Sequence, residues 1–412
     1  MTIKSTQLDM LRAQLDRLAR FDGGFYQAKL GRARLGADDP QSEFETLPFT
    51  DKDELRGTYP LGIAAVGERE IIRIHSSSGT TGKPVIIPYT KKDVDDWALM
   101  FKRCYEMAGV TSLDRIHVTP GYGLWTAGIG FQLGAELLGA MVIPMGPGNT
   151  EKQLMMMADL GSTVLCATSS FALLLAEEIE KRGLRDQIRL TKGVIGSERW
   201  GEKMRRRIST ELGISLYDIY GLTEIYGPGI GISCDEDAGM HCFDDFVYLE
   251  IIDPKTGKNL PDGEYGELVI TTLQKEGAPL IRYRTHDLTR ILPGTCACGD
   301  TNTRIDTLIG RTDDMIKVKG VNIYPGQVED VLRDVDGVSS EYRVTIDHVD
   351  GKDVMTLTFE TEPDADKSDV EKYVRTIFKS RVGLTIEPNA VPLGVLPRSE
   401  KKTARVLDNR YS

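Results

Sequence analysis

The sequence has little of what would place a protein in a specialised class. Aromatic residues make up 7% of the chain, with three tryptophans, five histidines and six cysteines among 412 residues. Apolar runs stay well below the roughly 18 residues of a membrane-spanning helix. The N-terminal residues become amphipathic at once, which is not typical of a signal peptide. Few cysteines and no export signal indicate a reducing compartment, so we expect a cytoplasmic protein without a membrane span.

Charge and length narrow the class further. Lysine and arginine number 51 against 62 acidic residues, and the net charge of -11 disfavours a nucleic-acid-binding surface. A hydrophobic fraction of 40% is ordinary for a folded protein and excludes a disordered one. Because a single core stops growing near ~250–300 residues, we expect one large and one small domain.

Short apolar runs alternate with amphipathic stretches in the first half of the chain. Leu8, Leu11, Leu15 and Leu18 share one helical face, which predicts a helix over residues 5–20. Further on, the pattern predicts buried strands over residues 116–120, 141–145, 163–167 and 193–197, and helices over residues 93–109, 148–160, 171–182 and 202–212. Buried strands separated by helices indicate a large, multi-layer α/β domain with parallel strands.

The pattern changes to strands separated by turns near residue 246. Residues 247–253, 266–273 and 281–285 predict strands, and we expect a β-rich subdomain over about residues 243–309. After Gly310 come a strand, a helix, two strands and a helix, which indicate a small α+β domain of about 100 residues.

A stretch of small and hydroxyl residues lies between two apolar runs. Its members are Ser76, Ser77, Ser78, Gly79, Thr80, Thr81, Gly82, Lys83 and Pro84. Small residues let a backbone approach a ligand closely, and successive N–H groups can hold phosphate oxygens. It is not a Walker A loop, because Ser77 replaces the required Gly and Pro84 the required Ser or Thr. A hairpin turn would use fewer such residues, so the stretch predicts a phosphate-binding loop.

Further strings follow in a fixed order. They are GSE at residues 196–198, YGLTE at 220–224, YRTHDL at 283–288, GRTDDMIKVKGVNIYP at 310–325 and PRSEKKTARV at 397–406. With the stretch at 76–84, they resemble the signatures of the adenylate-forming superfamily, the acyl-CoA synthetases and their relatives. The resemblance covers most of the chain. A solvated turn at a strand end would explain any one string but not the whole set.

The resemblance implies where a nucleotide would bind. The adenine would lie near Tyr220, and the neighbouring positions are Gly196, Ser197, Glu198 and Gly221. Thr223 would contact a phosphate, and Glu224 would hold Mg²⁺, a hard cation that takes carboxylate oxygens. Asp287 and Arg311 would contact the ribose, whose hydroxyls can donate to a fixed carboxylate.

The resemblance also implies a C-terminal domain that rotates. Asp313 matches the hinge, which divides the chain into residues 1–312 and 313–412. Lys319 and Gly320 belong to the segment that would face the thiol substrate after rotation. The catalytic lysine matches Lys402, although the neighbouring Lys401 stands where close relatives usually have Gly. A lysine there would offset negative charge as a carboxylate approaches the α-phosphate.

Other strings resemble the phenylacetate–CoA ligase branch of the superfamily, which activates aryl acids. They are LPFTDKDELRGTYP at residues 47–60, GYGLWTAGIG at 121–130, PGNTEKQL at 147–154 and PLIRYRTHDLT at 279–289. From the match at 121–130, we expect Tyr122, Trp125 and Ala127 near the acid. Trp125 itself and residues 132–134 and 168–171 depart from the branch pattern, so the identity of the acid stays open.

Cys234, His241, Cys296 and Cys298 form a candidate metal site. Thiolates and imidazole are the usual ligands of structural zinc, and three cysteines with one histidine complete a tetrahedron. Cys296 and Cys298 share a face of an extended chain, whereas Cys242, next to His241, should point away. Similar placements in the phenylacetate–CoA ligase branch favour zinc over the alternative, four reduced residues in two loops.

These observations predict an ATP-dependent acid–CoA ligase that acts on an aryl or arylacetic acid. The carboxylate would attack the α-phosphorus of ATP, giving an acyl-adenylate and pyrophosphate, and the CoA thiol would then displace AMP. Its cofactors and substrates would be ATP, Mg²⁺, CoA, structural Zn²⁺ and a small carboxylic acid. Two alternatives stay open: adenylation with an amine or carrier-protein thiol as acceptor, and a non-catalytic AMP-binding sensor. We expect no nucleic-acid or membrane partner. A homodimer is compatible with the sequence, but no sequence feature predicts it.

Overall fold

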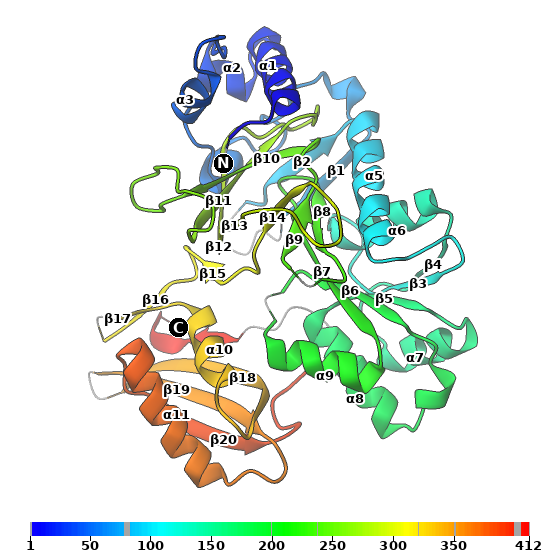
Figure 1. Cartoon of the computed structure of the whole chain (residues 1–412), viewed down its shortest axis with the longest axis vertical. Coiled ribbons are helices and arrows are strands. Elements are labelled where there is room, and N and C mark those ends of the chain that lie inside the picture. The colour runs from blue at the N-terminus through cyan, green and yellow to red at the C-terminus, as the bar shows by residue number, and fades with distance from the viewer. Residues whose placement is uncertain are drawn as a thin grey trace.

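The largest element of the fold is a nine-stranded sheet that changes from parallel to antiparallel at β7 (Figure 1). The structure, a computed structural model, describes residues 2–77, 83–198, 200–236, 238–319, 321–349, 352–398 and 405–411. The strand order is β13-β14-β9-β8-β7-β6-β5-β3-β4. Strands β3 to β7 pair in parallel, and the pairs from β7 to β13 are antiparallel. The bounds are β3 Arg115–Val118, β4 Met141–Pro144, β5 Val164–Thr168, β6 Lys192–Gly196, β7 Ser215–Leu222, β8 Gly227–Ser233, β9 Met240–Cys242, β13 Ile291–Leu292 and β14 Thr303–Ile305.

Helices cover both faces of the parallel half of this sheet. They are α5 Lys91–Met107, α6 Ala127–Leu138, α7 Thr150–Asp159, α8 Ser169–Lys181 and α9 Glu202–Leu212. Alternate residues of β5 enter different cores: Val164 and Cys166 join the core with α5 and α6, and Leu165 and Ala167 join the core with α7, α8 and α9. Because both faces are buried, these strands have the continuous apolar runs that the sequence shows.

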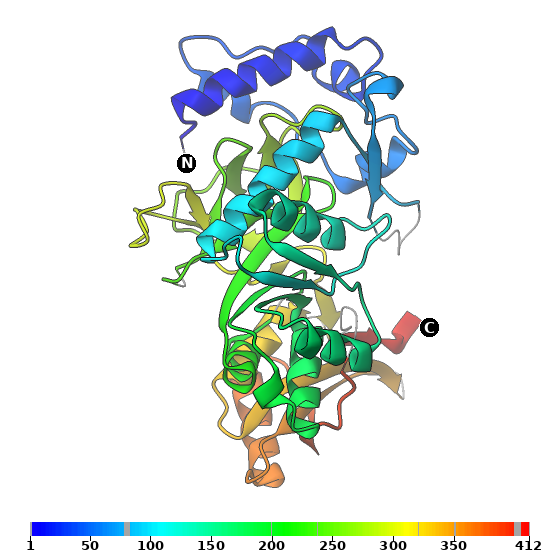
Figure 2. The same cartoon turned by 90° about the vertical axis from the view of Figure 1, so that its right-hand side faces the viewer.

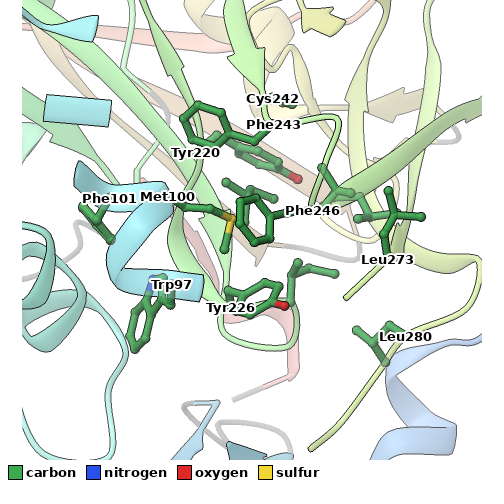
Figure 3. Close-up of a cluster of buried hydrophobic side chains, with 14 of the residues drawn as sticks. Trp97, Met100, Phe101, Tyr220, Tyr226, Cys242, Phe243, Phe246, Leu273 and Leu280 are labelled. Carbon is green, nitrogen blue, oxygen red and sulfur yellow. The ribbon is translucent and has the colours of Figure 1, made fainter. Parts of the chain in front are cut away.

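The core beside α5 is rich in aromatic side chains. Figure 3 shows Trp97, Met100 and Phe101 of α5 grouped with Tyr226 and Phe246, and all belong to one buried cluster. The Trp97 indole also donates a hydrogen bond to the Pro228 carbonyl at 2.9 Å. The helix is thereby fixed to the antiparallel half of the sheet.

Helix α6 is an element that the sequence analysis did not predict. Its residues include Gly128, Gly130 and Gly134, which have low helix propensity. A Cβ at Gly130 would lie 2.5 Å from the Trp97 ring, and a Cβ at Gly134 would lie 2.3 Å from Phe101. The glycines therefore allow α5 and α6 to pack closely, a tertiary requirement that outweighs local propensity.

The N-terminal helices form the end of the molecule opposite the C-terminal domain, and a second, antiparallel sheet lies between the two (Figures 1 and 2). The strand order is β10-β11-β12-β15, with bounds β10 Val247–Ile252, β11 Gly266–Thr272, β12 Tyr283–Thr289 and β15 Gly310–Arg311. The helices are α1 Ser5–Arg20, α2 Phe25–Leu30, α3 Pro40–Glu45 and α4 Lys52–Gly57. A separate hairpin pairs β1 Arg73–Ser76 with β2 Ile86–Tyr89. The strands within residues 243–309 thus divide between two sheets.

The C-terminal residues fold around a core of their own. A four-stranded sheet with the order β20-β19-β18-β21 carries α10 and α11, and a short hairpin joins β16 to β17. The bounds are β16 Ile316–Val318, β17 Val321–Ile323, α10 Pro325–Arg333, β18 Val338–Val349, β19 Lys352–Thr361, α11 Lys367–Val382, β20 Glu387–Pro392 and β21 Val406–Asp408. This core contains residues from Val318 to Ile386 and none from the α/β layers.

Polar contacts join this domain to α8 and α9. Lys203 donates to the carbonyls of Val335 and Val338 at 2.7 and 2.6 Å. Arg398 bonds Glu360 of its own domain at 2.8 Å and Glu177 of α8 at 2.7 Å. Arg207 of α9 also bonds Glu177, at 2.9 Å.

The predicted fold class is confirmed: a large α/β part with parallel strands and β-rich segments precedes a small α+β domain. The helix over 5–20 has the predicted bounds, as does that over 202–212. The four predicted buried strands lie within two residues of β3, β4, β5 and β6. In the described part of the chain, every helix is too short or too polar to cross a membrane.

A buried ion pair holds the second sheet to the N-terminal helices. Arg282 bonds both oxygens of Glu250, at 2.8 and 3.1 Å, with 3% and 1% of the side chains exposed. Its guanidinium also donates to the carbonyls of Glu45 and Leu47 and lies 4.2 Å from the centroid of the Phe49 ring.

We predict that Glu250→Leu destabilises the protein by about 3–5 kcal/mol, because it leaves a buried guanidinium without its carboxylate. Urea unfolding followed by tryptophan fluorescence measures this change. The control is Arg375→Met, which removes the exposed pair with Glu387 and should cost less than about 1 kcal/mol. Equal effects of the two substitutions would contradict the stabilising role of the buried pair.

Candidate active site

A cleft of about 1440 Å³ lies where the two large sheets meet the C-terminal domain. The carboxyl ends of parallel strands β6 and β7 open into it, the usual position of ligand sites in α/β sheets. The predicted site residues that line it are Ser77, Trp125, Ala127, Ser197, Glu198, Tyr220, Gly221, Thr223, Glu224, Asp287 and Arg311. Helix α10 and strand β18 complete the wall with Pro325, Glu329, Arg333, Ser339 and Tyr342, among others.

A chain of hydrogen bonds converges on the Asp287 carboxylate. The Tyr220 hydroxyl donates to Oδ2 at 2.6 Å, and the Arg311 guanidinium donates to Oδ1 at 2.8 Å. Burial raises the pKa of Asp287, and the positive charge of Arg311 opposes that rise. Arg311 also bonds both oxygens of Asp313 at 2.8 and 2.9 Å. Since a carboxylate offers about four lone-pair sites, Asp287 keeps acceptor capacity for a ligand.

The turn after β7 carries a buried carboxylate, that of Glu224. Its side chain is 4% exposed, and its Oε1 lies 3.0 Å from the Lys52 ammonium. These two atoms attract by charge, but their geometry is not that of a hydrogen bond, and Oε1 has no hydrogen-bond partner among the described residues. Thr223 lies beside it, with its hydroxyl 3.3 Å from that of Thr126. A buried oxygen without a hydrogen bond fits a cation ligand.

The base of the predicted phosphate loop is closed by hydrogen bonds between its two ends. The Ser77 N–H donates to the Val85 carbonyl, and the Val85 N–H donates to the Ser77 hydroxyl, both at 3.0 Å. The Ser76 N–H bonds the Leu124 carbonyl, and the Lys83 ammonium lies 5.1 Å from the centroid of the Tyr59 ring. Five predicted residues, Ser78, Gly79, Thr80, Thr81 and Gly82, lie outside the described residues.

The string at residues 196–198 forms a tight bend after β6. A Cβ at Gly196 would lie 2.4 Å from the Ile219 carbonyl, so this position needs glycine. Ser197 has a left-handed φ of 68°, and Glu198 turns back to cap α8. Its Oε2 accepts from the Ser169 hydroxyl and the Ser170 N–H, both at 3.0 Å. The bend exposes Ser197 and Glu198 to the cleft.

The predicted acid-binding residues do not all reach the cleft. Trp125 and Ala127 line it, and 46% of Trp125 is exposed. Tyr122 is not among the lining residues, and its ring lies against α6, 2.8 Å from a Cβ built at Gly128. Gly196, Lys83, Asp313 and Lys319 also lie outside the described lining, whereas Gly320 and Lys402 are not described.

Two lining residues, Lys52 and Thr126, were not given a role from the sequence. Both lie in strings that resemble phenylacetate–CoA ligases, at residues 47–60 and 121–130. Nothing in those strings shows that Lys52 of α4 approaches Glu224, more than 170 positions later in the chain. Only folding brings the lysine and the carboxylate together.

The predicted metal ligands form a compact cluster. The ligand atoms of Cys234, His241, Cys296 and Cys298 all lie within 4.8 Å of one another. The Cys234 and Cys296 sulfurs are 3.6 Å apart, and Nε2 of His241 is 3.5 Å from the Cys298 sulfur. On the other side of the ring, Nδ1 of His241 lies 3.0 Å from Asp300. Tetrahedral zinc with bonds of about 2.0–2.3 Å requires ligand separations of this size, so the donor set fits zinc.

Two family models match this chain. The model described as AMP-binding enzyme covers residues 27–274, and the model described as AMP-binding enzyme C-terminal domain covers residues 320–410. Together they include most of the nine-stranded sheet, part of the cleft and most of the C-terminal domain, and they leave residues 275–319 unmatched.

Curated relatives match over nearly the full length. The chain is 41% identical to the phenylacetate–coenzyme A ligase of Escherichia coli, over 93% of this chain and 90% of the relative. It is 39% identical to the phenylacetate–coenzyme A ligase of Thermus thermophilus, over 94% and 92%.

Solved structures of 2-hydroxyisobutyryl-CoA ligase share the fold. In its postadenylation state that enzyme superposes with a TM-score of 0.86 at 24% identity, over 98% of this chain and 89% of that one. In its thioesterification state the TM-score is 0.70 at 25% identity, over the same shares.

The family models and the relatives agree with the geometry of the cleft. The chain belongs to the AMP-binding enzymes, in the branch of the phenylacetate–coenzyme A ligases, and is an ATP-dependent, AMP-forming acid–CoA ligase.

Proposed function

We propose that this ligase activates an aryl or arylacetic acid. The main support is identity near 40% with curated phenylacetate–coenzyme A ligases over almost the entire chain. The chemistry of the cleft agrees, because aromatic and other apolar side chains are among those that line it. They include Pro120, Trp125, Ala127, Pro147 and Phe171.

For the nucleotide, we assign Asp287 and Arg311 to the ribose and Tyr220, Gly221 and the bend at 196–198 to the adenine. The hydrogen bonds of Tyr220 and Arg311 to Asp287 support this assignment, since they fix the carboxylate before a ligand arrives. The loop at 76–83 and Thr223 would hold the phosphates.

Glu224 is the proposed ligand of Mg²⁺. Its buried Oε1, without a hydrogen bond in the described structure, supports this role. When bound, Mg²⁺ would neutralise charge on the phosphates. Lys52, 3.0 Å from the same oxygen, would then be free to contact a phosphate.

The proposed mechanism uses two arrangements of the domains, residues 1–312 and 313–412. In the first, Lys402 neutralises charge as the substrate carboxylate attacks the α-phosphorus and pyrophosphate leaves. The C-terminal domain then turns about Asp313, and Lys319 and Gly320 face the CoA thiol, which attacks the acyl carbon and displaces AMP. Two structures of a relative, in postadenylation and thioesterification states, support such a cycle. One active site can thus serve two reactions that need different groups.

Structural zinc is proposed at Cys234, His241, Cys296 and Cys298. The hydrogen bond from His241 to Asp300 supports it, because it leaves Nε2 to face the sulfurs. All four positions would be filled by protein, so the ion would have no vacancy for catalysis.

None of the six cysteines forms a disulfide bond, which agrees with the proposed cytoplasmic location. A homodimer stays a prediction.

We predict that phenylacetate supports CoA-dependent pyrophosphate release with at least a ~10-fold higher kcat/KM than octanoate. The two acids have the same number of carbon atoms, but the flexible chain loses more conformational freedom on binding. Preference for octanoate would contradict the assignment of an aryl acid, while ligase activity itself would stand.

Lys402→Ala should lower adenylation by at least about 100-fold, because a positive charge beside the reacting oxygens is lost. Thioester formation from premade acyl-adenylate should change less than about 2-fold. Lys401→Ala is the matched control and should leave both half-reactions near wild type. Equal losses in both halves for Lys402→Ala would exclude the two-arrangement mechanism.

Purified protein should contain about one zinc per chain, and Cys296→Ser and Cys298→Ser should each abolish it, because a closed site needs all four ligands. The melting temperature should fall in parallel. The control, Cys242→Ala, changes a buried cysteine outside the cluster and should retain zinc even if stability falls. Metal analysis that finds zinc unchanged in both cluster variants would rule out the site.

A further inference from the structure

A fully buried lysine lies behind the turn that carries Glu224. Lys275 follows β11 and is 0% exposed. Its ammonium donates to the carbonyl oxygens of Ile225 and, at 3.4 Å, Glu224. It also faces two aromatic rings, with centroids 4.6 Å away for Tyr89 and 4.8 Å away for Tyr226. None of the roles proposed above uses this side chain.

The two carbonyls need a donor that the sheet does not supply. The β7–β8 pairing nearest the turn is Leu222 with Gly227, so residues 223–226 only connect the strands. Glu224 is 3% exposed and Ile225 0%. Because buried carbonyls are costly when unpaired, the ammonium determines whether this turn is stable in its present shape.

Burial of the Lys275 ammonium costs solvation free energy. Burial lowers the pKa of Lys275 to about 7, even though the carboxylates of Asp93 and Glu224 act in the opposite direction. Lysine is almost never fully buried unless it is paired, and here no carboxylate bonds it in the described structure. Two ring faces and two carbonyls replace water around the charge.

The backbone of Lys275 is fixed by contacts from two helices. Its carbonyl accepts hydrogen bonds from Gln14 and Arg17 of α1 at 2.7 and 3.0 Å. Asp93 of α5 accepts the next two N–H groups, those of Glu276 and Gly277, at 2.7 and 2.8 Å. The ammonium therefore projects from a rigid frame.

The same frame is joined to the strand that follows the phosphate loop. Tyr89, the last residue of β2, donates its hydroxyl to the Tyr226 carbonyl at 2.9 Å. A Cβ at Gly277 would lie 2.5 Å from the Pro88 carbonyl, so the segment after Lys275 packs directly on β2. Lys275 thus lies where the strand after the loop and the Glu224 turn meet.

We propose that Lys275 is a positioning residue for adenylation, which fixes the Glu224 turn and so aims the Glu224 carboxylate into the nucleotide cleft. This inference rests on the proposed Mg²⁺ role of Glu224. It assigns no contact between Lys275 and the substrates.

Lys275→Met tests the proposal, because it keeps the volume of the side chain and removes the ammonium. We expect the Mg²⁺ concentration for half-maximal pyrophosphate release to rise about 10-fold and the maximal rate to fall by a similar factor, as for partners that orient a metal ligand. Thioester formation from premade acyl-adenylate should stay within about 2-fold of wild type, since it does not use the Glu224 carboxylate.

Tyr226→Phe is the matched control. It retains the ring face and removes a hydroxyl that has no hydrogen-bond partner among the described residues. Its Mg²⁺ dependence should match wild type, whereas Tyr226→Leu should resemble Lys275→Met. If Lys275→Met does not fold, the same Mg²⁺ dependence is measured for Lys275→Gln and Tyr226→Leu.

Two negative results have different meanings. Equal loss of both half-reactions with unchanged Mg²⁺ dependence would reduce Lys275 to a stability residue and overturn the inference. Glu224→Gln, assayed in parallel, tests the role on which the inference depends. Unchanged Mg²⁺ dependence in Glu224→Gln would overturn the metal role and the inference with it, whereas a shift in Glu224→Gln alone would overturn only the role of Lys275.

Discussion

The arrangement of the cleft depends on the hydrogen bonds that the buried carboxylate of Asp287 accepts. This carboxylate lies on β12 of the second sheet, accepts from Tyr220 on β7 of the first, and pairs with Arg311 on the neighbouring strand β15. The two large sheets therefore meet at one group. Because a buried charge without partners is so costly, these sheets must keep their relative positions while the carboxylate stays ionised.

On one side of this junction the elements are closely packed, and on the other side two separate cores meet through polar contacts. On the closely packed side, the glycines of α6 let the helix interlock with α5, and Lys275 holds the Glu224 turn against α1 and α5. On the other side, the C-terminal domain has a separate core and contacts α8 and α9 through hydrogen bonds and ion pairs. Such a division suits the proposed mechanism, in which the C-terminal domain turns relative to a fixed nucleotide site.

Sequence patterns predicted the features whose signals are local. Parallel strands such as β5 are buried on both faces and therefore show continuous apolar runs, and cysteine and histidine are rare enough for a cluster of four to be noticed. Helix α6 was missed because its glycines serve contacts with Trp97 and Phe101. Lys52 and Lys275 were missed because a lysine in a sequence resembles any solvated lysine. Their partners, Glu224 and the turn after it, are chosen by tertiary structure.

The arrangement of the ion pairs between the domains determines which charges keep a partner when the domains separate. Arg398 has two carboxylates, Glu360 within its own domain and Glu177 on α8, and Glu177 in turn has Arg207 on α9. If the domains part, each side retains one complete pair, and no charge is stranded in an apolar interior. Of these ion pairs, only that between Arg398 and Glu177 is lost, and water can take the place of Arg398 at Glu177, whose side chain is 26% exposed. This ionic contact is thus specific in its geometry but costs little free energy to break.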